Sequence, residues 1–280
     1  MNTSLTLGFS PCPNDTFMFY PLVHGLVETD GLSYRERLED VETLNQLALQ
    51  GELDVSKVSY HAFGQIRDQY ALLRSGSALG RGCGPLLVAA EAIDPASLRG
   101  KTIAVPGRYT TALLLLQLFD PNLNNFIIMP FNEIMDAVLS GNVDAGLIIH
   151  ESRFTYQGFG LHKLLDLGEW WEGETGLPTP LGGIVAKRSL GAKTIAAVER
   201  ALKAGVDYAR THPDEAARYI GEHAQEMSPE VCAAHIGLYV NDFSTDLGDE
   251  GIKAVSCLMQ RAEQAGIIPH SEIPLFAELE

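Results

Sequence analysis

The sequence predicts a two-lobed α/β protein whose lobes are joined by two chain crossings. One observation is an internal repeat, because two βαβ modules occur within a chain of 280 residues. The other is a pair of glycine-led strands, one before and one after the second module, which mark a passage out of the first lobe and a return to it. We expect a discontinuous larger lobe of residues 1–91 and 183–280, an inserted smaller lobe of residues 92–182, and a ligand cleft between them.

The repeat consists of residues 44–60 and residues 134–150, which follow one plan. Each begins with a helical pattern, passes through a glycine to an aspartate three residues later, and ends in a short apolar strand. The matching pairs are Gly51 with Gly141, Asp54 with Asp144, and Tyr60 with His150. Ligands of open α/β sheets bind beyond the carboxyl ends of the strands, so the repeat predicts that Ser59 and Tyr60 face His150 across the cleft.

Both modules are predicted to start with a short apolar strand and a turn. The first has a strand over 5–9 and a proline-rich turn, after which Asn14 or Asp15 caps a helix that runs towards Gly25. Gly51 is expected to close a helix in a left-handed conformation. The other predicted elements are strands at 32–38, 53–58, 102–105 and 146–150, and helices at 41–50, after Tyr60 and after Thr110.

The two crossings are predicted from glycine. Residues 74–84 contain four glycines but lack the G-x-G-x-x-G spacing, and they lead into an apolar strand over 85–90 rather than a helix. We therefore reject a dinucleotide-binding loop. The glycines here are expected to give the backbone flexibility and to let it approach a ligand closely. Residues 181–186 have the same form and are predicted as the return crossing.

Residues 189–266 are helix-rich and lack strands of their own. The predicted helices span 189–211, a short stretch after Pro213, a segment capped by Ser228 with Pro229 at its first position, and a segment after Gly248. Because they have no sheet to complete, we expect them to pack on the first module.

The charge balance argues against a polyanionic partner. The chain has 36 acidic and 20 basic residues, for a net charge of −16, and this field repels nucleic acids and anionic lipid surfaces. We expect a small-molecule ligand, and no obligate protein partner is inferred. A ligand that carries a carboxylate needs local donors, and the candidates are Lys57, Arg108, Arg153 and helix N-termini.

Neither a targeting segment nor a cysteine framework is visible. The amino terminus lacks the basic start, apolar stretch and cleavage site of a signal peptide, and no apolar run approaches the roughly 18 residues of a membrane helix. We therefore expect a cytoplasmic protein without membrane insertion. The four cysteines form no C-x-x-C pair and the eight histidines no H-x-x-H pattern, so neither a disulfide framework nor a metal site is expected.

His150 is the candidate catalytic residue. An imidazole at the carboxyl end of a cleft-facing strand can take a proton near neutral pH, because its ordinary pKa is about 6.5. The alternative is a strand-end histidine whose ring is satisfied by a backbone carbonyl.

The candidate binding residues lie at a strand end and at a helix start. Lys57 and Ser59 share one side of their strand while Val58 enters the other layer. The helix that follows the turn at Arg108 offers hydroxyls and free amides to a carboxylate. The residues of this helix start are Thr110, Thr111 and Ala112. A polar strand end and simple helix capping are the alternatives.

Two further features remain open from the residues alone. Cys12 lies between two prolines at a helix start, where it is either a nucleophile or a small turn residue. Trp170 and Trp171, next to two prolines, form either a lid or a packed corner.

Four segments taken together closely resemble the 1,4-dihydroxy-6-naphthoate synthases of the futalosine route to menaquinone. The match runs over nearly the whole chain, and the joint occurrence is more specific than any one motif. The segments are GFSPCPNDTF at 8–17, LEDVETLN at 38–45, PGRYTTA at 106–112 and GLIIHESRFT at 146–155.

The resemblance implies a type II periplasmic-binding-protein-like fold used as a cytoplasmic carbon-carbon lyase. The implied substrate is cyclic dehypoxanthine futalosine, converted to 1,4-dihydroxy-6-naphthoate without metal or organic cofactor. By resemblance, His150 is the proton acceptor, and the substrate contacts are Lys57, Val58, Ser59, Thr111 and Ala112. The residues themselves, apart from the resemblance, add further candidates for substrate binding, namely Asn14, Asp15, Arg108, Thr110 and Arg153. A non-catalytic solute-binding or ligand-sensing protein of this fold, or an enzyme similar to chorismate dehydratase, is the alternative.

Overall fold

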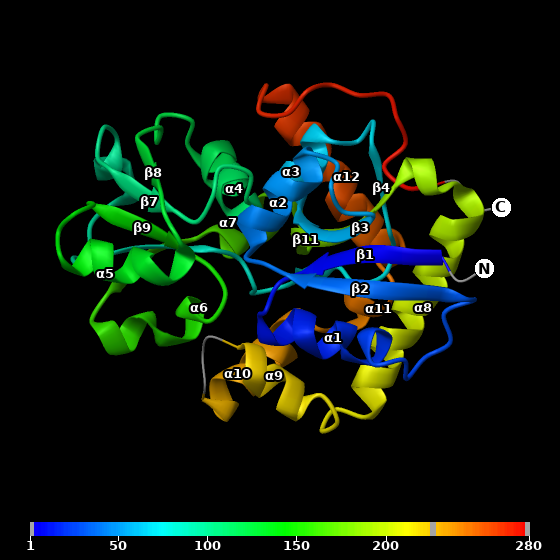
Figure 1. Cartoon of the computed structure of the whole chain (residues 1–280). Coiled ribbons are helices and arrows are strands. Elements are labelled where there is room, and N and C mark those ends of the chain that lie inside the picture. The colour runs from blue at the N-terminus through cyan, green and yellow to red at the C-terminus, as the bar shows by residue number, and fades with distance from the viewer. Residues whose placement is uncertain (1–2, 225–227, 278–280) are drawn as a thin grey trace.

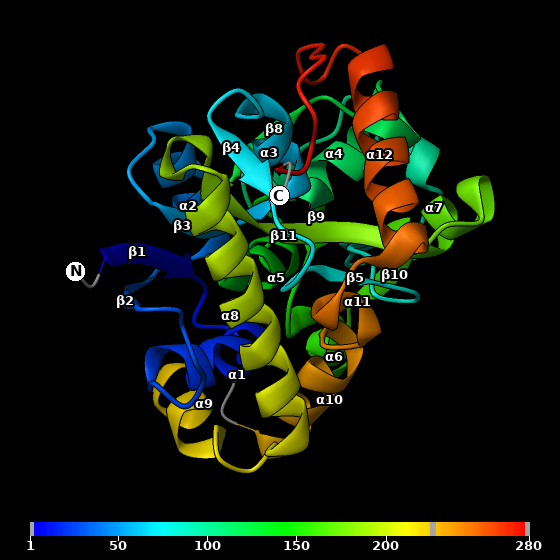
Figure 2. The same cartoon turned by 90° about the vertical axis from the view of Figure 1, so that its right-hand side faces the viewer.

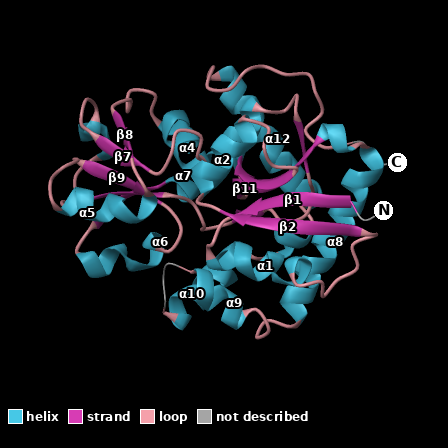
Figure 3. Ribbon diagram, viewed as in Figure 1, coloured by secondary structure: helices cyan, strands magenta, loops and turns pink. Residues whose placement is uncertain are grey.

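The computed structural model describes residues 3–224 and 228–277, which form two lobes built around separate sheets (Figure 1). The strands gather into two distinct groups, and helices cover both (Figure 3). Among the described residues, no helix combines the length and the apolar content that crossing a membrane requires.

The first sheet has six strands in the order β2-β1-β3-β11-β4, with β5 paired to β11. β1, β2 and β3 are parallel, and β11 runs antiparallel to its neighbours. The bounds are β1 Thr3–Phe9, β2 Leu32–Leu38, β3 Val55–Ser59, β4 Tyr70–Leu72, β5 Ala78–Gly80 and β11 Thr179–Lys187.

The second sheet has five strands in the order β10-β6-β9-β7-β8. β7, β8 and β9 are parallel, whereas β6 is antiparallel to both β9 and β10. The bounds are β6 Leu86–Ala89, β7 Ile103–Val105, β8 Phe126–Ile128, β9 Ala145–Ile148 and β10 His162–Asp166.

Helices α1, α2 and α3 accompany the first sheet, and α4 to α7 accompany the second. The later helices return to the first lobe, where α8 packs on α1 and α12 packs beside β11 (Figure 2). The bounds are α1 Pro13–Val23, α2 Val41–Leu49, α3 Tyr60–Gln65, α4 Thr111–Phe119, α5 Ile134–Leu139, α6 Ser152–Thr155, α7 Leu167–Thr175, α8 Ala192–Thr211, α9 Ala217–His223, α10 Pro229–Tyr239, α11 Asp242–Thr245 and α12 Gly248–Gln264.

The predicted repeat is present, and its glycine and its aspartate have the same structural roles in both lobes. Gly51 and Gly141 follow α2 and α5 with φ of +69° and +71°, the left-handed region that glycine adopts without strain. The aspartate three residues later binds the parallel neighbour of its own strand, at β1 in the first lobe and just before β7 in the second. Asp54 accepts hydrogen bonds from the amide and hydroxyl of Thr6, and Asp144 accepts one from the amide of Thr102.

The crossings fall earlier in the chain than predicted. β6, assigned from sequence to residues 1–91 of the larger lobe, pairs with β9 and β10 in the second sheet. β11 begins at Thr179, before the predicted boundary at 182/183, and belongs to the first sheet. A run of apolar residues shows that a strand is buried without showing which sheet it joins, so hydrophobicity alone misplaced β6.

An apolar core crosses from one lobe to the other. Buried side chains of β3, α3 and α12 form one cluster with those of α4, β9 and α7. Trp171 is fully buried in this cluster, and its indole N–H donates to the carbonyl of Pro178. The tryptophan pair is therefore a packed corner rather than a lid.

Two local predictions differ from the structure close to the cleft. Strand β9 ends at Ile148, two residues before the predicted end at His150. Helix α1 is capped by Cys12, with Pro13 at its first position, and Asn14 and Asp15 lie inside the helix. The Asp15 carboxylate instead accepts hydrogen bonds from the amide and hydroxyl of Ser10.

Candidate functional site

A cavity with about 690 Å³ of empty space, part of it open to solvent, lies between the lobes. This size is in the range of small-molecule sites. Nine of the residues predicted from sequence line it, namely Asn14, Asp15, Lys57, Val58, Ser59, Thr110, Thr111, Ala112 and His150.

Lys57 reaches the cavity from β3 as half of a buried ion pair. Its ammonium lies 3.0 Å from Oδ1 of Asp15 and 3.2 Å from the carbonyl oxygen of Gly76. Both side chains are almost fully buried, at 7% and 2% exposure. Breaking such a pair would leave an uncompensated buried charge, so the pair holds α1 against β3.

Ser59 ends β3 and is fixed by one side chain of α2. Its amide donates to Oδ1 of Asn45 over 2.9 Å, and Asn45 Nδ2 donates to its hydroxyl over 3.2 Å. The adjacent Val58 packs its side chain in the core cluster, as strand alternation predicts. Tyr60 departs from the predicted symmetry with His150, because its phenol is buried against Ser77 rather than facing the cavity.

The start of α4 brings polar groups of the second lobe into the cavity. Thr110 is the N-cap, and its hydroxyl accepts from the amide of Leu113. The amides of Thr111 and Ala112 precede the first intrahelical hydrogen bond, so helix geometry leaves them free for a ligand. The Thr111 hydroxyl joins the lobes, because it accepts from the Tyr60 amide and donates to the carbonyl of Leu181.

A second polar contact joins the two lobes beside the start of α4. The Glu42 carboxylate on α2 accepts hydrogen bonds from the amides of Arg108 and Tyr109, at 3.0 and 3.2 Å. Gly107 permits the approach, because a Cβ there would lie 2.4 Å from a carboxylate oxygen of Glu42.

His150 stands two residues beyond β9 with φ of +55°. A left-handed conformation is unfavourable for a residue with a side chain, and such outliers gather at functional sites. Burial lowers the pKa of the imidazole from its usual 6.5, while the nearby Glu151 opposes the shift. The neutral, proton-accepting form is therefore favoured near pH 7.

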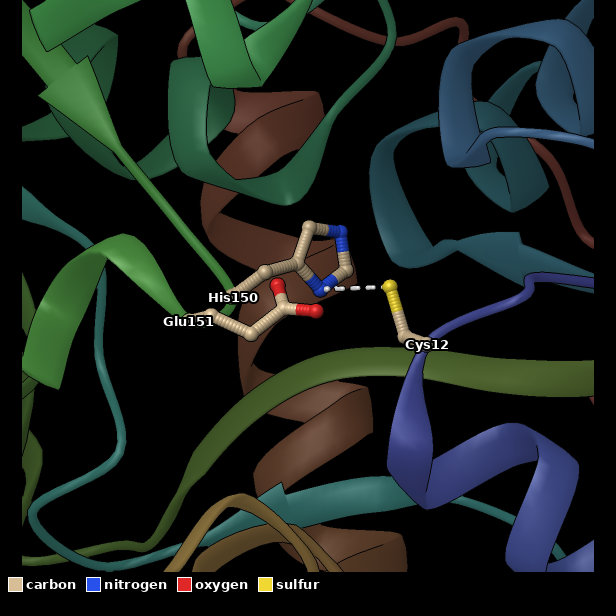
Figure 4. A group of neighbouring side chains, drawn as sticks. All are labelled: Cys12, His150 and Glu151. Carbon is tan, nitrogen blue, oxygen red and sulfur yellow. Dashed lines mark hydrogen bonds between the residues drawn. The ribbon is translucent and has the colours of Figure 1, made fainter. Parts of the chain in front are cut away.

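His150 meets Cys12 directly across the cleft (Figure 4). Nδ1 of His150 lies 3.4 Å from Sγ of Cys12, and the Glu151 carboxylate completes the group. Burial raises the pKa of the Cys12 thiol well above its ordinary value, which favours the protonated form and argues against a nucleophilic thiolate.

The described part of the chain has one cluster whose donor atoms suit a metal ion. Cys12, His150 and Glu151 bring a sulfur, a nitrogen and a carboxylate oxygen within 4.8 Å of one another. Three such donors are one fewer than a closed structural zinc site has.

Two predicted ligand-binding cations lie outside the cavity lining. Arg153 donates to the carbonyl oxygens of Gly82 and Gly84 and pairs with Asp166 over 2.7 Å, so it holds the first crossing in place. The side chain of Arg108 is exposed, and only its amide takes part, through Glu42. A residue that is close in sequence to the cleft residues need not direct a long side chain into the cleft.

The site includes residues that the sequence did not single out. His235 and Tyr239 line the cavity from α10, with ring centroids 4.6 Å apart. His235 is 1% exposed, and neither of its ring nitrogens has a hydrogen-bond partner among the described residues. No local pattern around α10 distinguishes these two from ordinary core residues, so only the tertiary arrangement reveals them.

Two α/β lobes around a cleft define the class of proteins with the periplasmic-binding-protein fold. A protein of Candida albicans described as having this generic fold superposes with a TM-score of 0.69 and 16% identity, covering 96% of this chain and 92% of that one. At this identity the likeness shows the fold alone. A protein of Archaeoglobus fulgidus with a known crystal structure gives a TM-score of 0.88 and 38% identity, over 95% of this chain and 98% of that one.

Within this class the chain belongs to a family of menaquinone biosynthesis, whose model matches residues 5–264. A relative from Thermus thermophilus named 1,4-dihydroxy-6-naphthoate synthase is 52% identical over 273 residues, or 98% of this chain and 99% of the relative. The chain is therefore a member of the 1,4-dihydroxy-6-naphthoate synthase family, an enzyme family of menaquinone biosynthesis, as its sequence motifs predicted.

Proposed function

We propose that this protein is a carbon-carbon lyase that converts cyclic dehypoxanthine futalosine to 1,4-dihydroxy-6-naphthoate, with His150 as proton acceptor. The observation that carries the proposal is the position of His150, whose imidazole lines the interlobe cavity together with Ser59 and the start of α4. Membership of the naphthoate synthase family supports the choice of substrate and product.

The carboxylate of the substrate binds at the start of α4. The free amides of Thr111 and Ala112 and the positive end of the helix favour an anion there. Lys57 and Ser59 contribute from the opposite lobe, although the charge of Lys57 is already balanced by Asp15. Arg108 and Arg153 are not among the proposed contacts, because their side chains are engaged or directed elsewhere.

The reaction begins with transfer of a proton from a carbon beside a carbonyl to the imidazole of His150. The electron pair of the C–H bond stays on the substrate as an enolate, and cleavage of a carbon-carbon bond in the former ribose part follows. Aromatisation to the naphthoate supplies the driving force, and we propose that no metal or organic cofactor takes part.

Enclosure by the two lobes supports this chemistry. Contacts from Glu42 and Thr111 close the cleft beside the cavity, and a site with little water strengthens each electrostatic interaction with the developing charge. A half-buried imidazole whose pKa is lowered, and which is therefore neutral, is a competent proton acceptor at cytoplasmic pH. We accordingly propose a cytoplasmic protein whose partner is this small substrate.

The first test is turnover by purified protein, followed by naphthoate absorbance. We expect His150→Ala to retain substrate binding, measured by calorimetry, but to lose turnover by roughly 10²–10⁴-fold, as removal of a general base does. His162→Ala, a change to an exposed histidine on β10, is the matched control and should keep wild-type turnover. Unchanged turnover in His150→Ala would disprove the assigned role.

Two other results of the same assay would redirect the functional proposal. Tight binding of the substrate without any product, in folded wild-type protein, would favour a non-catalytic binding or sensing protein. Dehydration of chorismate in place of naphthoate formation would favour the chorismate dehydratase alternative. The fold itself does not distinguish these functions.

A further inference from the structure

His150 lines two cavities, which also share Val41. One is the large interlobe cavity that contains Lys57, Ser59 and the start of α4. The other is a smaller cavity behind the imidazole, lined by Cys12, Asp40 and Glu151 among others. Cys12 and Glu151 line only the smaller cavity, so they and a substrate in the large cavity would meet His150 from different cavities.

Cys12 contacts the imidazole of His150 at Nδ1. Its Sγ lies 3.4 Å from Nδ1, within hydrogen-bond distance for sulfur, and the residue is 5% exposed. The carbonyl of Cys12 accepts from the amides of Asp15 and Thr16, so the first turn of α1 holds the cysteine in place. Nε2 of His150 makes no hydrogen bond with the described residues and is left for the substrate.

Glu151 is a buried carboxylate without a partner. The residue is 6% exposed, and neither carboxylate oxygen accepts a hydrogen bond from the described residues. An unpaired buried carboxylate is costly, and buried charges are normally paired. Figure 4 shows the carboxylate beside the ring of His150, and the acceptor atoms of the group lie within 4.8 Å.

Asp40, the other carboxylate of the smaller cavity, is already engaged. It caps α2 by accepting hydrogen bonds from the amides of Glu42 and Thr43. Of the acids that line the smaller cavity, Glu151 alone is both next to His150 and without partners.

We propose that Glu151 and Cys12 are positioning residues for His150, which rests on the proposed function. Cys12 accepts the Nδ1–H of the neutral imidazole and so presents the lone pair of Nε2 to the substrate. When the C–H proton moves to Nε2, the ring becomes an imidazolium with both nitrogens protonated, and the electron pair of the broken C–H bond stays on the substrate. The Glu151 carboxylate then balances the new positive charge, while the thiol of Cys12 stays protonated throughout.

Among the surrounding charges, Glu151 most strongly opposes the effect of burial on the pKa of His150. Burial and Lys57 lower the pKa of His150, whereas Glu151, Asp15 and Asp40 raise it, with Glu151 the strongest of the three. His235 faces the ring from α10, 6.2 Å away between centroids, and brings no negative charge. Removal of the Glu151 charge should therefore make His150 a weaker base.

NMR of the full-length protein with labelled histidine tests the charge pairing without substrate. We expect Glu151→Gln to lower the pKa of His150 by at least about one unit, and Glu151→Asp to restore part of it. Cys12→Ala should shift the tautomer balance of His150 from Nδ1–H towards Nε2–H, read from the ¹⁵N shifts, and Cys12→Ser should partly rescue it. Glu174→Gln and Cys257→Ala, changes at an exposed glutamate of α7 and a half-buried cysteine of α12, are the matched controls.

Steady-state kinetics provide the second readout. The acidic limb of the kcat profile of Glu151→Gln should move to lower pH, because a weaker base stays unprotonated longer as pH falls. Its plateau should drop roughly tenfold or more while KM changes little. A purely structural role would lower stability or raise KM without moving the limb.

The two proposals fail in distinguishable ways. Absence of naphthoate formation by wild-type protein would refute the proposed function while the NMR titration still reported the charge pairing. An unchanged pKa and tautomer of His150 in folded Glu151→Gln and Cys12→Ala would refute the positioning role even if turnover of the futalosine substrate were established.

Discussion

His235 is a buried polar residue whose two ring nitrogens have no hydrogen-bond partner among the described residues. Its imidazole on α10 lies beside Tyr239 and Phe154. Burial lowers its pKa well below 6.5, so the ring is neutral at pH 7. A buried polar group without a partner costs free energy that an apolar side chain of similar volume does not.

Replacement of this imidazole should therefore stabilise the fold. We expect His235→Leu to raise the free energy of unfolding by about 1 kcal/mol, measured by urea-induced unfolding at pH 7.5. The exposed His162→Leu serves as control, with a change of less than about 0.5 kcal/mol. A clear loss of stability in His235→Leu would show that the imidazole has a partner, such as an ordered water.

Local signals predicted residues whose role depends on their own strand or helix. Ser59 and Thr111 stand at the end of β3 and the start of α4, where strand and helix geometry alone expose polar groups. The contact of Cys12 with His150 joins residues 138 positions apart on different lobes, so no local pattern contains it. The orientation of Arg153 was not predictable for a related reason, because its guanidinium donates to the carbonyls of Gly82 and Gly84, about 70 positions away.

At the scale of elements, the repeat was predictable because each unit carries its own turn chemistry. Glycine ends the helix in a left-handed conformation, and aspartate ties the next strand to its neighbour, as the Thr6 and Thr102 contacts show. The sheet to which β6 belongs was harder to predict, since β6 pairs antiparallel with both β9 and β10 in the second sheet. Sheet membership depends on long-range pairing, which strand propensity does not encode.

The first crossing depends on a close backbone approach that a substitution can test. A Cβ on Gly84 would lie 2.1 Å from the amide nitrogen of Gly168, at the first turn of α7. Because the obstacle is backbone rather than a flexible side chain, we expect Gly84→Ala to destabilise the protein by roughly 2–3 kcal/mol in urea unfolding.

Gly173 is the matched control for this substitution. It lies inside α7 with open space around its Cβ position, so Gly173→Ala should stabilise the protein by up to about 1 kcal/mol through helix propensity. Equal stability of Gly84→Ala and wild type would mean that the crossing relaxes away from α7 at little cost.

For the whole molecule, sequence predicted two lobes with a cleft but not how the lobes meet. The contacts that close the cleft come from Glu42, Thr111 and Cys12, each reaching an element of the other lobe or of the return strand. His61 on α3 lies in the same region, with Nδ1 3.3 Å from the carbonyl of Thr110. Three histidines therefore lie at or near the junction of the lobes, namely the buried His61 and His235 and the half-buried His150.

These histidines predict that the fold weakens in mild acid. Burial lowers the pKa of His61 from 6.5 to about 4, and those of His150 and His235 also fall. Below pH 6.5 the unfolded chain binds protons that the folded protein does not, so stability present above pH 6.5 is lost as pH falls towards the folded pKa. His61 alone should remove about 1.4 kcal/mol of unfolding free energy by pH 5.5. The raised pKa of His270 acts in the opposite sense, but that ring is exposed.

Urea-induced unfolding at pH 7.5, 6.5 and 5.5 measures this loss while staying above the isoelectric point of about 4.8. We expect the free energy of unfolding to change little between pH 7.5 and 6.5 and to fall steeply by pH 5.5. The side chain of His61→Asn cannot titrate. Between pH 7.5 and pH 5.5, the free energy of unfolding of this variant should therefore fall by about 1.4 kcal/mol less than that of wild type. If wild type and His61→Asn lose the same stability, His61 is protonated in the folded state as readily as in the unfolded chain, and the junction of the lobes is wetter than its burial indicates.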